Sequence, residues 1–266
     1  MNAEIKVGAK SYFINFKKFT DLSIPLKFNG EQPNTYNVNQ ASSFAYKDNS
    51  FVGDTRLGGP CNFETYTLTP HCNGTHTECI GHITDERVSI NDSLREMFMP
   101  ATLITLTPCI TNETYSPCLN NDDLVVTKKE IESKLSSVDT SFLDGLIIRT
   151  VPNNENKLKK KYSGNESPFF TIEAMNYIVE LGVKHLLVDF PSVDRLLDDG
   201  KLTCHNIFWE TNNKKLNLAA RGKTITEMIF VSNDIIDGKY LLNIQIPSFV
   251  SDAAPSKPII FEVNEV

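Results

Sequence analysis

A helix that runs straight into a buried strand is the feature that most constrains the fold of this 266-residue chain. The segment 170–181 repeats apolar residues at helical spacing and ends at Gly182, and the apolar run HLLVDF begins at residue 185. Earlier in the chain, a helix predicted over 127–135 precedes the continuous apolar run GLIIRT at 145–150. This alternation indicates an α/β fold rather than an all-β fold.

Further strands are predicted on both sides of these pairs. The β-branched run at 101–110 is typical of a buried strand, and the first seventy residues resemble short strands joined by turns. Two last strands are predicted within 240–250 and 258–263, so the sheet should recruit both ends of the sequence. No repeat and no linker rich in proline or serine divides the chain, and we expect one domain over residues 1–266.

The charge of the chain excludes several classes of partner. The formal net charge is −7, which disfavours binding to nucleic acid and to anionic membranes and favours a small-molecule substrate or a protein partner. The polar N-terminus lacks the apolar core of a secretory signal, and no run of eighteen apolar residues occurs. We therefore expect a cytoplasmic protein whose six cysteines are thiols or metal ligands rather than disulfides.

The segment 153–167 is polar and carries the only basic cluster, and it is predicted to be an exposed loop. Solvation of a surface loop explains the cluster, and capture of an anionic substrate or partner is the sharper alternative. The cluster consists of Lys157, Lys159, Lys160 and Lys161.

The segment HCNGTHTECIGH at 71–82 points to chemistry. Cys72, His76 and Glu78 are spaced so that one local loop could present a thiolate, an imidazole and a carboxylate to one divalent cation. Three protein ligands leave coordination positions open, which is typical of a catalytic metal site. His82 follows four residues after Glu78 and would be free to act as an acid or base.

Each of these residues also has a structural explanation. A lone cysteine is usually a small buried hydrophobic residue, and a lone histidine more often satisfies a hydrogen bond than binds metal. The grouping of four such residues beside glycine favours the metal site. A third interpretation of these residues is a structural zinc site. Against it, Cys61, Cys72 and Cys79 are unevenly spaced and form no C-x-x-C pair.

The run from Gly74 to His82 resembles the H-x-G-T-H-x-D-x-P-x-H signature of the putative cyclase family, metal-dependent hydrolases that include bacterial kynurenine formamidase and isatin hydrolase. DLSIPL at 21–26 resembles the family's opening segment, and 167–194 resembles its helix, strand and following loop. His205 and Glu227 resemble the late histidine and glutamate that face the family's metal centre. The likeness covers most of the chain from Asp21 onward.

The resemblance implies a fold and an activity. The fold is an α/β single domain with a central mixed, barrel-like β-sheet and surrounding helices. The activity is hydrolysis of a carbon–nitrogen bond in a linear or cyclic amide, as an arylformamidase performs it, by a protein that is a homodimer or a larger homo-oligomer.

Three positions depart from the family signature. Cys72 stands where the family has its first histidine, Glu78 replaces an aspartate, and Ile80 replaces a proline. If the chain before Gly74 is extended, His71 and Cys72 point to opposite faces, and the register selects Cys72 as the ligand. A thiolate there would favour zinc over manganese.

These residues suggest a hydrolytic mechanism. Cys72, His76 and Glu78 would hold the cation and make hydroxide available as the nucleophile, and His82 would move the proton to the leaving nitrogen. His205 and Glu227 would orient substrate or water, or help Glu78 to hold a second cation. The alternative is a family member that has lost catalysis and binds a metal or a small molecule.

Without the resemblance, some of these residues would be assigned structural roles. Glu227 would be an acid at a helix N-terminus, and Phe208 and Trp209 would be core residues. Ser192 and Asp194 lie where a strand ends, a position that suits either a turn or a site.

Overall fold

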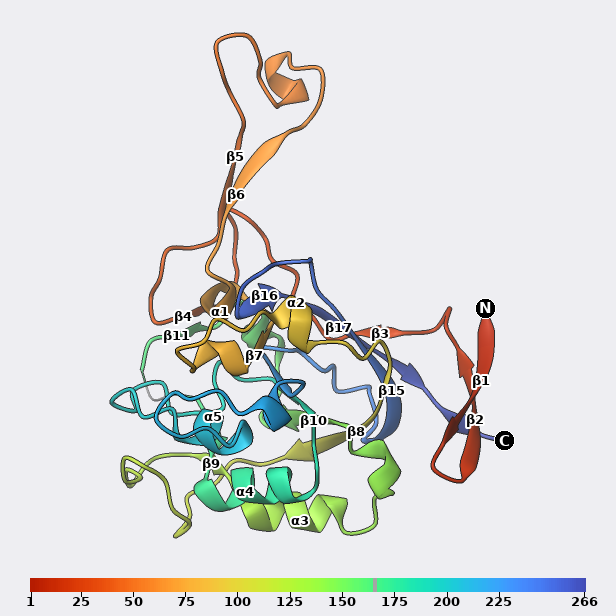
Figure 1. The fold of residues 1–266 in the computed structure, drawn as a ribbon. Coiled ribbons are helices and arrows are strands. Elements are labelled where there is room, and N and C mark those ends of the chain that lie inside the picture. The colour runs from red at the N-terminus through yellow and green to blue at the C-terminus, as the bar shows by residue number, and fades with distance from the viewer. Residues whose placement is uncertain (165–166) are drawn as a thin grey trace.

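The predicted buried strands lie side by side in one mixed sheet that curls into a half-barrel (Figure 1). The computed structural model describes residues 1–164 and 167–266. Within the sheet, β8, β10, β13 and β14 run parallel, and antiparallel strands flank them. In spatial order the strands are β16 (Ala253–Pro255), β7 (His76–Cys79), β14 (Thr224–Glu227), β13 (His185–Val188), β10 (Gly145–Thr150), β8 (Met99–Leu106), β15 (Gly238–Gln245), β17 (Lys257–Glu262) and β3 (Thr20–Asp21). The expected α/β fold with a mixed, barrel-like sheet is confirmed.

Helices cover one face of the parallel strands. The longest are α3 (Lys128–Leu135) and α4 (Ile172–Glu180), and each begins after a threonine whose hydroxyl accepts a hydrogen bond from a backbone N–H in the first turn. Apolar residues of these helices pack on β10 and β13 and form the largest core cluster. The shorter helices are α1 (Pro70–Asn73), α2 (Ile90–Ser93) and α5 (Thr203–Phe208).

The predicted strands match the observed ones with small shifts at their ends. β10 has the predicted bounds, whereas β8 ends at Leu106, before the Thr107–Pro108 pair. Pro108 has no backbone N–H to continue the ladder. The prediction that both ends of the sequence join the sheet is confirmed, because β3 pairs with β17 at one edge.

The N-terminal region adds small elements outside the main sheet. β1 (Asn2–Val7) and β2 (Lys10–Asn15) form a hairpin that β18 (Asn264–Glu265) extends. β5 (Ser42–Ala45) and β6 (Glu64–Thr67) form an arm that projects far from the body of the molecule (Figure 1). Two short parallel pairs complete the fold: β4 (Asn34–Thr35) with β11 (Lys161–Tyr162), and β9 (Val125–Val126) with β12 (Phe169–Phe170).

The basic segment 153–167 is only partly the exposed loop that we predicted. It contains a 3-10 helix over Glu155–Lys159, and Lys157 turns inward to a buried ion pair with Asp189 at 2.7 Å. Residues 165 and 166 lie outside the described part of the chain. Lys159 pairs with Glu31 at the surface, as a solvated lysine would.

Two further observations concern the cysteines and the helices. All six cysteines lie in the described part of the chain, and all are free thiols, as expected. None of the helices in the described residues has the length and apolarity that crossing a bilayer requires.

Candidate metal centre

Two antiparallel strands present the first three polar residues of the site. β7 pairs with β14 so that His76 lies opposite Glu227 and Glu78 lies opposite Ile225. Because side chains alternate along a strand, His76 and Glu78 share one face of β7. All three side chains are almost completely buried, and His76 Nε2 lies 3.4 Å from Glu227 Oε2. The assignment of Glu227 to a helix N-terminus is wrong, since it ends a strand.

A helical turn, and not an extended segment, precedes Gly74. Residues 70–73 form α1, so the expectation that His71 and Cys72 point to opposite faces of an extended chain is wrong. The turn carries the His71 ring to Glu78, with Nδ1 3.0 Å from Oε2. Among the described residues, the Cys72 thiol belongs to none of the three donor groups close enough to share a metal ion. Burial and the charge of Glu227 raise the pKa of this thiol.

A close backbone approach places His82 beside the same carboxylate. A 3-10 turn over Ile80–His82 follows β7. A Cβ atom on Gly81 would lie 2.1 Å from the backbone oxygen of Val88, so this turn requires glycine. The His82 Nε2 atom lies 3.8 Å from Glu78 Oε2, and 28% of its side chain is exposed. His82 can therefore be reached from solvent, whereas His76 cannot.

Helix α5 carries His205, and the loop after β13 carries Asp194, which contacts it. Asp194 Oδ2 lies 2.6 Å from His205 Nδ1, and the other ring nitrogen lies 3.0 Å from Glu78 Oε1. Glu227 accepts a hydrogen bond from the Val193 backbone N–H, which ties the same loop to β14. The neighbouring Trp209 and Phe208 are fully buried core residues.

Sequence reasoning missed Asp252. Its Oδ2 atom lies 2.9 Å from His71 Nε2 and 3.3 Å from His82 Nδ1. The residue precedes β16, which pairs with β7 so that Ala253 lies opposite Glu78. No local motif marks this aspartate, and only the pairing of two strands far apart in the sequence reveals it.

The cluster contains the ligand atoms that a cation requires and a buried polar atom that lacks a hydrogen-bond partner. Three sets of side chains place their donor atoms within 4.8 Å of one another in the described residues. Among the described residues, the buried His76 Nε2 atom has no hydrogen-bond partner, and Glu78 Oε2 has none beyond its 3.0 Å ion-pair contact with His71 Nδ1. Buried polar atoms are normally fully partnered, so an unpartnered imidazole nitrogen and a carboxylate oxygen at one point fit a divalent cation. The three sets are His71, His76 and Glu78; Glu78, His82 and His205; and His71, His82 and Asp252.

Ionic contacts shift the pKa values of the cluster strongly. Burial alone would lower the pKa of His71, but its hydrogen bonds to Asp252 and Glu78 raise that pKa to about 10. Burial opposes ionisation of Glu78 as well, yet the histidines around it hold its pKa well below the ordinary value. Asp194 and Glu78 likewise outweigh burial at His205 and raise its pKa. These contacts therefore favour the protonated forms of His71 and His205 in the metal-free protein.

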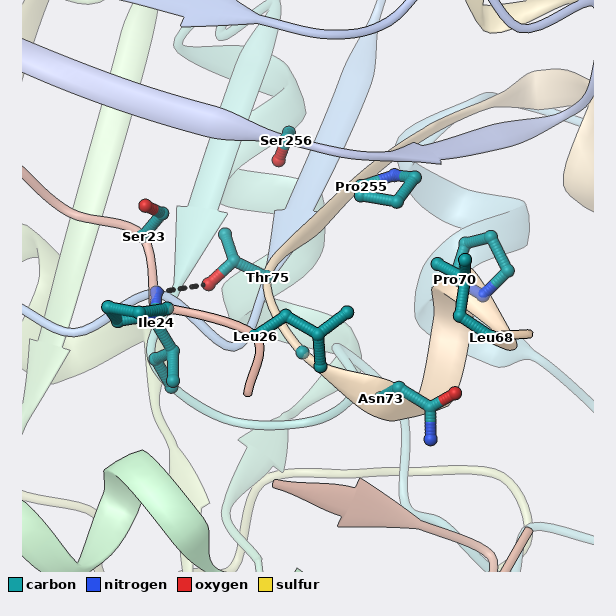
Figure 2. Close-up of a pocket in the computed structure, with 11 residues that line it drawn as sticks. Ser23, Ile24, Leu26, Leu68, Pro70, Asn73, Thr75, Pro255 and Ser256 are labelled. Carbon is teal, nitrogen blue, oxygen red and sulfur yellow. Dashed lines mark hydrogen bonds between the residues drawn. The ribbon is translucent and has the colours of Figure 1, made fainter. Parts of the chain in front are cut away.

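The segment at residues 23–26 supports the start of β7 from the side. The Thr75 hydroxyl accepts a hydrogen bond from the Ile24 backbone N–H (Figure 2). The same hydroxyl donates a hydrogen bond to the Met228 carbonyl. Leu26 and Pro70 line a cavity of about 160 Å³ beside this contact (Figure 2). Thr75, the residue before His76, is thus tied both to the segment at 23–26 and to Met228, the residue after Glu227.

Comparisons with known proteins agree with this architecture. The chain resembles the structure of a "predicted metal-dependent hydrolase" from Bacillus stearothermophilus, with a TM-score of 0.61 and 17% identity over 92% of this chain and 98% of that one. It also resembles isatin hydrolase A from Labrenzia aggregata, with a TM-score of 0.62 and 15% identity over 92% and 93% of the two chains. A third similar structure is an isatin hydrolase bound to the product analogue thioisatinate, with a TM-score of 0.57 and 12% identity over 93% of each chain. At these identities, the likeness shows the fold.

A comparison with curated protein sequences gave no significant match. The sequence profile described as "Putative cyclase" matches residues 20–195, which is more than half of the chain and includes β7 and the loop after β13. The chain belongs to the putative cyclase family.

Proposed function

We propose that this protein is a metal-dependent hydrolase that cleaves a carbon–nitrogen bond in a linear or cyclic amide. The observation that carries the proposal is the convergence of donor atoms from His71, His76 and Glu78 within 4.8 Å of one another, with the buried His76 Nε2 atom left unpartnered. Isatin hydrolases share the fold, which supports a cyclic amide as one substrate class.

The proposed ligands are His71, His76 and Glu78, because their donor atoms converge and two of these side chains are buried. His71 takes the place that the sequence had given to Cys72. A bound divalent cation supplies Lewis acidity, which polarises a carbonyl oxygen and lowers the pKa of water. Without a thiolate ligand the sequence argument for zinc over manganese no longer applies, and imidazole and carboxylate donors suit both metals. We keep zinc as the first ion to test and manganese as the alternative.

The remaining side chains provide proton transfer and orientation. His82 is proposed as the general acid–base, because it is part-exposed and its Nε2 faces Glu78. Asp194 holds the His205 ring, and Glu78 and Glu227 flank the opposite ring nitrogen at 3.0 and 3.9 Å. His205 and Glu227 are therefore proposed to orient substrate or water, or to help Glu78 to hold a second cation.

Metal analysis and two substitutions test this proposal. Protein reconstituted with zinc should contain one or two ions per chain and hydrolyse at least one of isatin, N-formylkynurenine and a panel of small lactams and N-acyl amines. His82→Ala should abolish turnover and keep the metal, whereas His76→Ala should remove both. Zinc binding without turnover on any amide would leave only the metal-binding alternative, and absence of zinc would refute the site.

We also propose that the protein acts as a homodimer or larger homo-oligomer in the cytoplasm on a small-molecule substrate. The projecting β5–β6 arm exposes Phe44, Phe63 and Tyr66, a concentration of aromatic surface that a second copy could cover. Light scattering of the purified protein measures the assembly directly, and a monomer at micromolar concentration would contradict this part of the proposal.

A further inference from the structure

One carboxylate oxygen serves two histidines of the candidate site. Asp252 Oδ2 lies 2.9 Å from His71 Nε2 and 3.3 Å from His82 Nδ1. The two imidazoles are stacked, with ring centroids 4.2 Å apart and an interplanar angle of 28°. Both rings therefore direct one nitrogen to the same oxygen atom.

The opposite nitrogens of the two rings face Glu78. His71 Nδ1 lies 3.0 Å and His82 Nε2 lies 3.8 Å from Glu78 Oε2. The stacked pair thus lies between an outer carboxylate, Asp252, and an inner one, Glu78. The outer carboxylate is 26% exposed and the inner one is buried.

The fold gives Asp252 little freedom to move away. The backbone oxygen of Asp252 accepts a hydrogen bond from the Cys79 N–H, one residue beyond Glu78. The preceding Ser251 carbonyl accepts a hydrogen bond from Ile90. These contacts anchor the aspartate beside β7 although it lies outside the residues that match the family profile.

An ionised carboxylate only accepts hydrogen bonds, so a ring nitrogen within hydrogen-bond distance of one carries a proton. We propose that Asp252 is a positioning residue that keeps a proton on His71 Nε2 and holds neutral His82 as the Nδ1–H tautomer, since His82 Nε2 lies 3.8 Å from Glu78, beyond hydrogen-bond distance. In the metal-free protein His71 Nδ1 also faces a carboxylate, that of Glu78, and carries a second proton, which a bound metal would replace. Nε2 of His82 is free to take a proton. The His71 half of this inference rests on the proposed metal site, whereas the His82 half does not.

Such outer carboxylates orient metal-binding histidines in general, and their loss weakens metal affinity about 10–100-fold. Here a single oxygen atom of Asp252 would orient both His71, the proposed metal ligand, and His82, the proposed general acid–base. The arrangement therefore predicts that a single substitution at position 252 changes metal affinity and proton transfer together.

The decisive measurement is the tautomer of His82, read from ring ¹⁵N and ¹H correlations in protein labelled at histidine, at a pH where this ring is neutral. The wild type should show Nδ1–H, and Asp252→Ala should shift the ring toward Nε2–H. This readout needs neither metal nor turnover. An unchanged tautomer in Asp252→Ala would overturn the proposal.

Zinc titration against a chromophoric chelator tests the His71 half. Asp252→Ala should weaken zinc binding about 10–100-fold, and Asp252→Asn, which keeps the volume of the side chain, should weaken it less. Asp122→Asn is the control. Asp122 is an exposed carboxylate that lies far from the candidate site in the sequence and belongs to none of the three donor groups of the described residues. Zinc affinity within twofold of wild type in Asp252→Ala would overturn this half.

Chemical rescue of Asp252→Ala distinguishes a positioning role of Asp252 from a role in packing. Because Asp252 is part-exposed, added formate should enter the space left in Asp252→Ala and restore the Nδ1–H tautomer of His82, with chloride as the control. If wild-type protein binds no zinc, the proposed function fails, and the His82 tautomer still decides the role of Asp252. If Asp252→Ala does not fold, Asp252→Leu, which keeps the bulk of the side chain but cannot accept a hydrogen bond, replaces it in both measurements with the same expected results.

Discussion

Two buried clusters of charge lie at the ends of neighbouring strands, and they differ in whether their polar atoms are partnered. At the ends of β10 and β13, Lys157 Nζ donates to Asp189 and to both oxygens of Thr150, and Asp189 also accepts from the Thr150 backbone N–H and hydroxyl. Next to them, at β14 and β7, the buried His76 Nε2 atom has no hydrogen-bond partner, and Glu78 Oε2 has only its ion-pair contact with His71.

The difference separates structure from function. A buried charge stabilises a fold only when its hydrogen bonds are complete. We therefore interpret the cluster of Lys157, Asp189 and Thr150 as a structural clamp, that is, a set of contacts that holds a loop against the sheet. An incomplete cluster costs free energy unless a ligand completes it. Position at a strand end is therefore not enough to identify a site, and the discriminating feature is an unpartnered buried atom among converging donor atoms.

The largest expected effect is at the complete cluster. Asp189→Ala leaves the Lys157 ammonium buried and unpaired and should lower the free energy of unfolding by about 3–5 kcal/mol. Chemical denaturation of metal-free protein measures this loss. Glu31→Ala, which breaks the exposed pair with Lys159, is the control and should cost less than about 1 kcal/mol. Equal costs would show that the clamp is not structural.

The second-largest effect is expected at His76, which is compared with His185, a histidine that is equally buried. His76→Ala should abolish zinc binding, because it removes a buried donor atom of the proposed site. His185 is also buried, and like His76 it makes one hydrogen bond and leaves Nε2 unpartnered, but it lies outside the three donor groups of the described residues. His185→Ala should therefore lose stability, by about 1–3 kcal/mol, and keep zinc. Isothermal titration with zinc distinguishes the two variants, and loss of binding in both would contradict the assignment.

The third prediction concerns pH. The pKa of His71 is raised to about 10, so its protonated form stabilises the metal-free protein below the ordinary value near 6.5. That contribution is lost as the pH rises through about 10. A metal that binds His71 must displace this proton, so zinc affinity should rise by up to about tenfold per pH unit between these limits. Flat affinity over this range would indicate that zinc does not bind His71.

The smallest effect is expected at Cys72. Because the thiol is outside the donor groups found in the described residues, Cys72→Ser should change zinc affinity by less than about threefold, equivalent to about 0.7 kcal/mol. Cobalt-substituted wild-type protein should show no thiolate-to-cobalt charge-transfer band. A strong band that disappears in Cys72→Ser would restore the thiolate as a ligand.

Local pattern was enough to predict the architecture. The spacing of apolar residues in α3, α4 and β10 and the threonines before the two helices are properties of single segments, and the family signature added the sheet that joins them. The observed sheet and helices follow these predictions closely, because each element buries the face that its own sequence defines.

The site was only partly predictable, for two physical reasons. The choice between His71 and Cys72 depended on whether residues 70–73 are extended or helical, and Pro70 at the first turn of α1 decides it. Asp252 enters the site through a strand pairing between residues more than 170 positions apart in the sequence, which no local pattern contains. Lys157 likewise looked solvated until Asp189 was placed beside it.

The most direct test of the central claim is a crystal structure of zinc-loaded protein with anomalous data collected at the zinc edge. We predict a fully occupied peak bonded to His71 Nδ1, His76 Nε2 and Glu78 Oε2. A peak away from these three side chains, or one bonded to Cys72 Sγ with His71 turned away, would contradict the account.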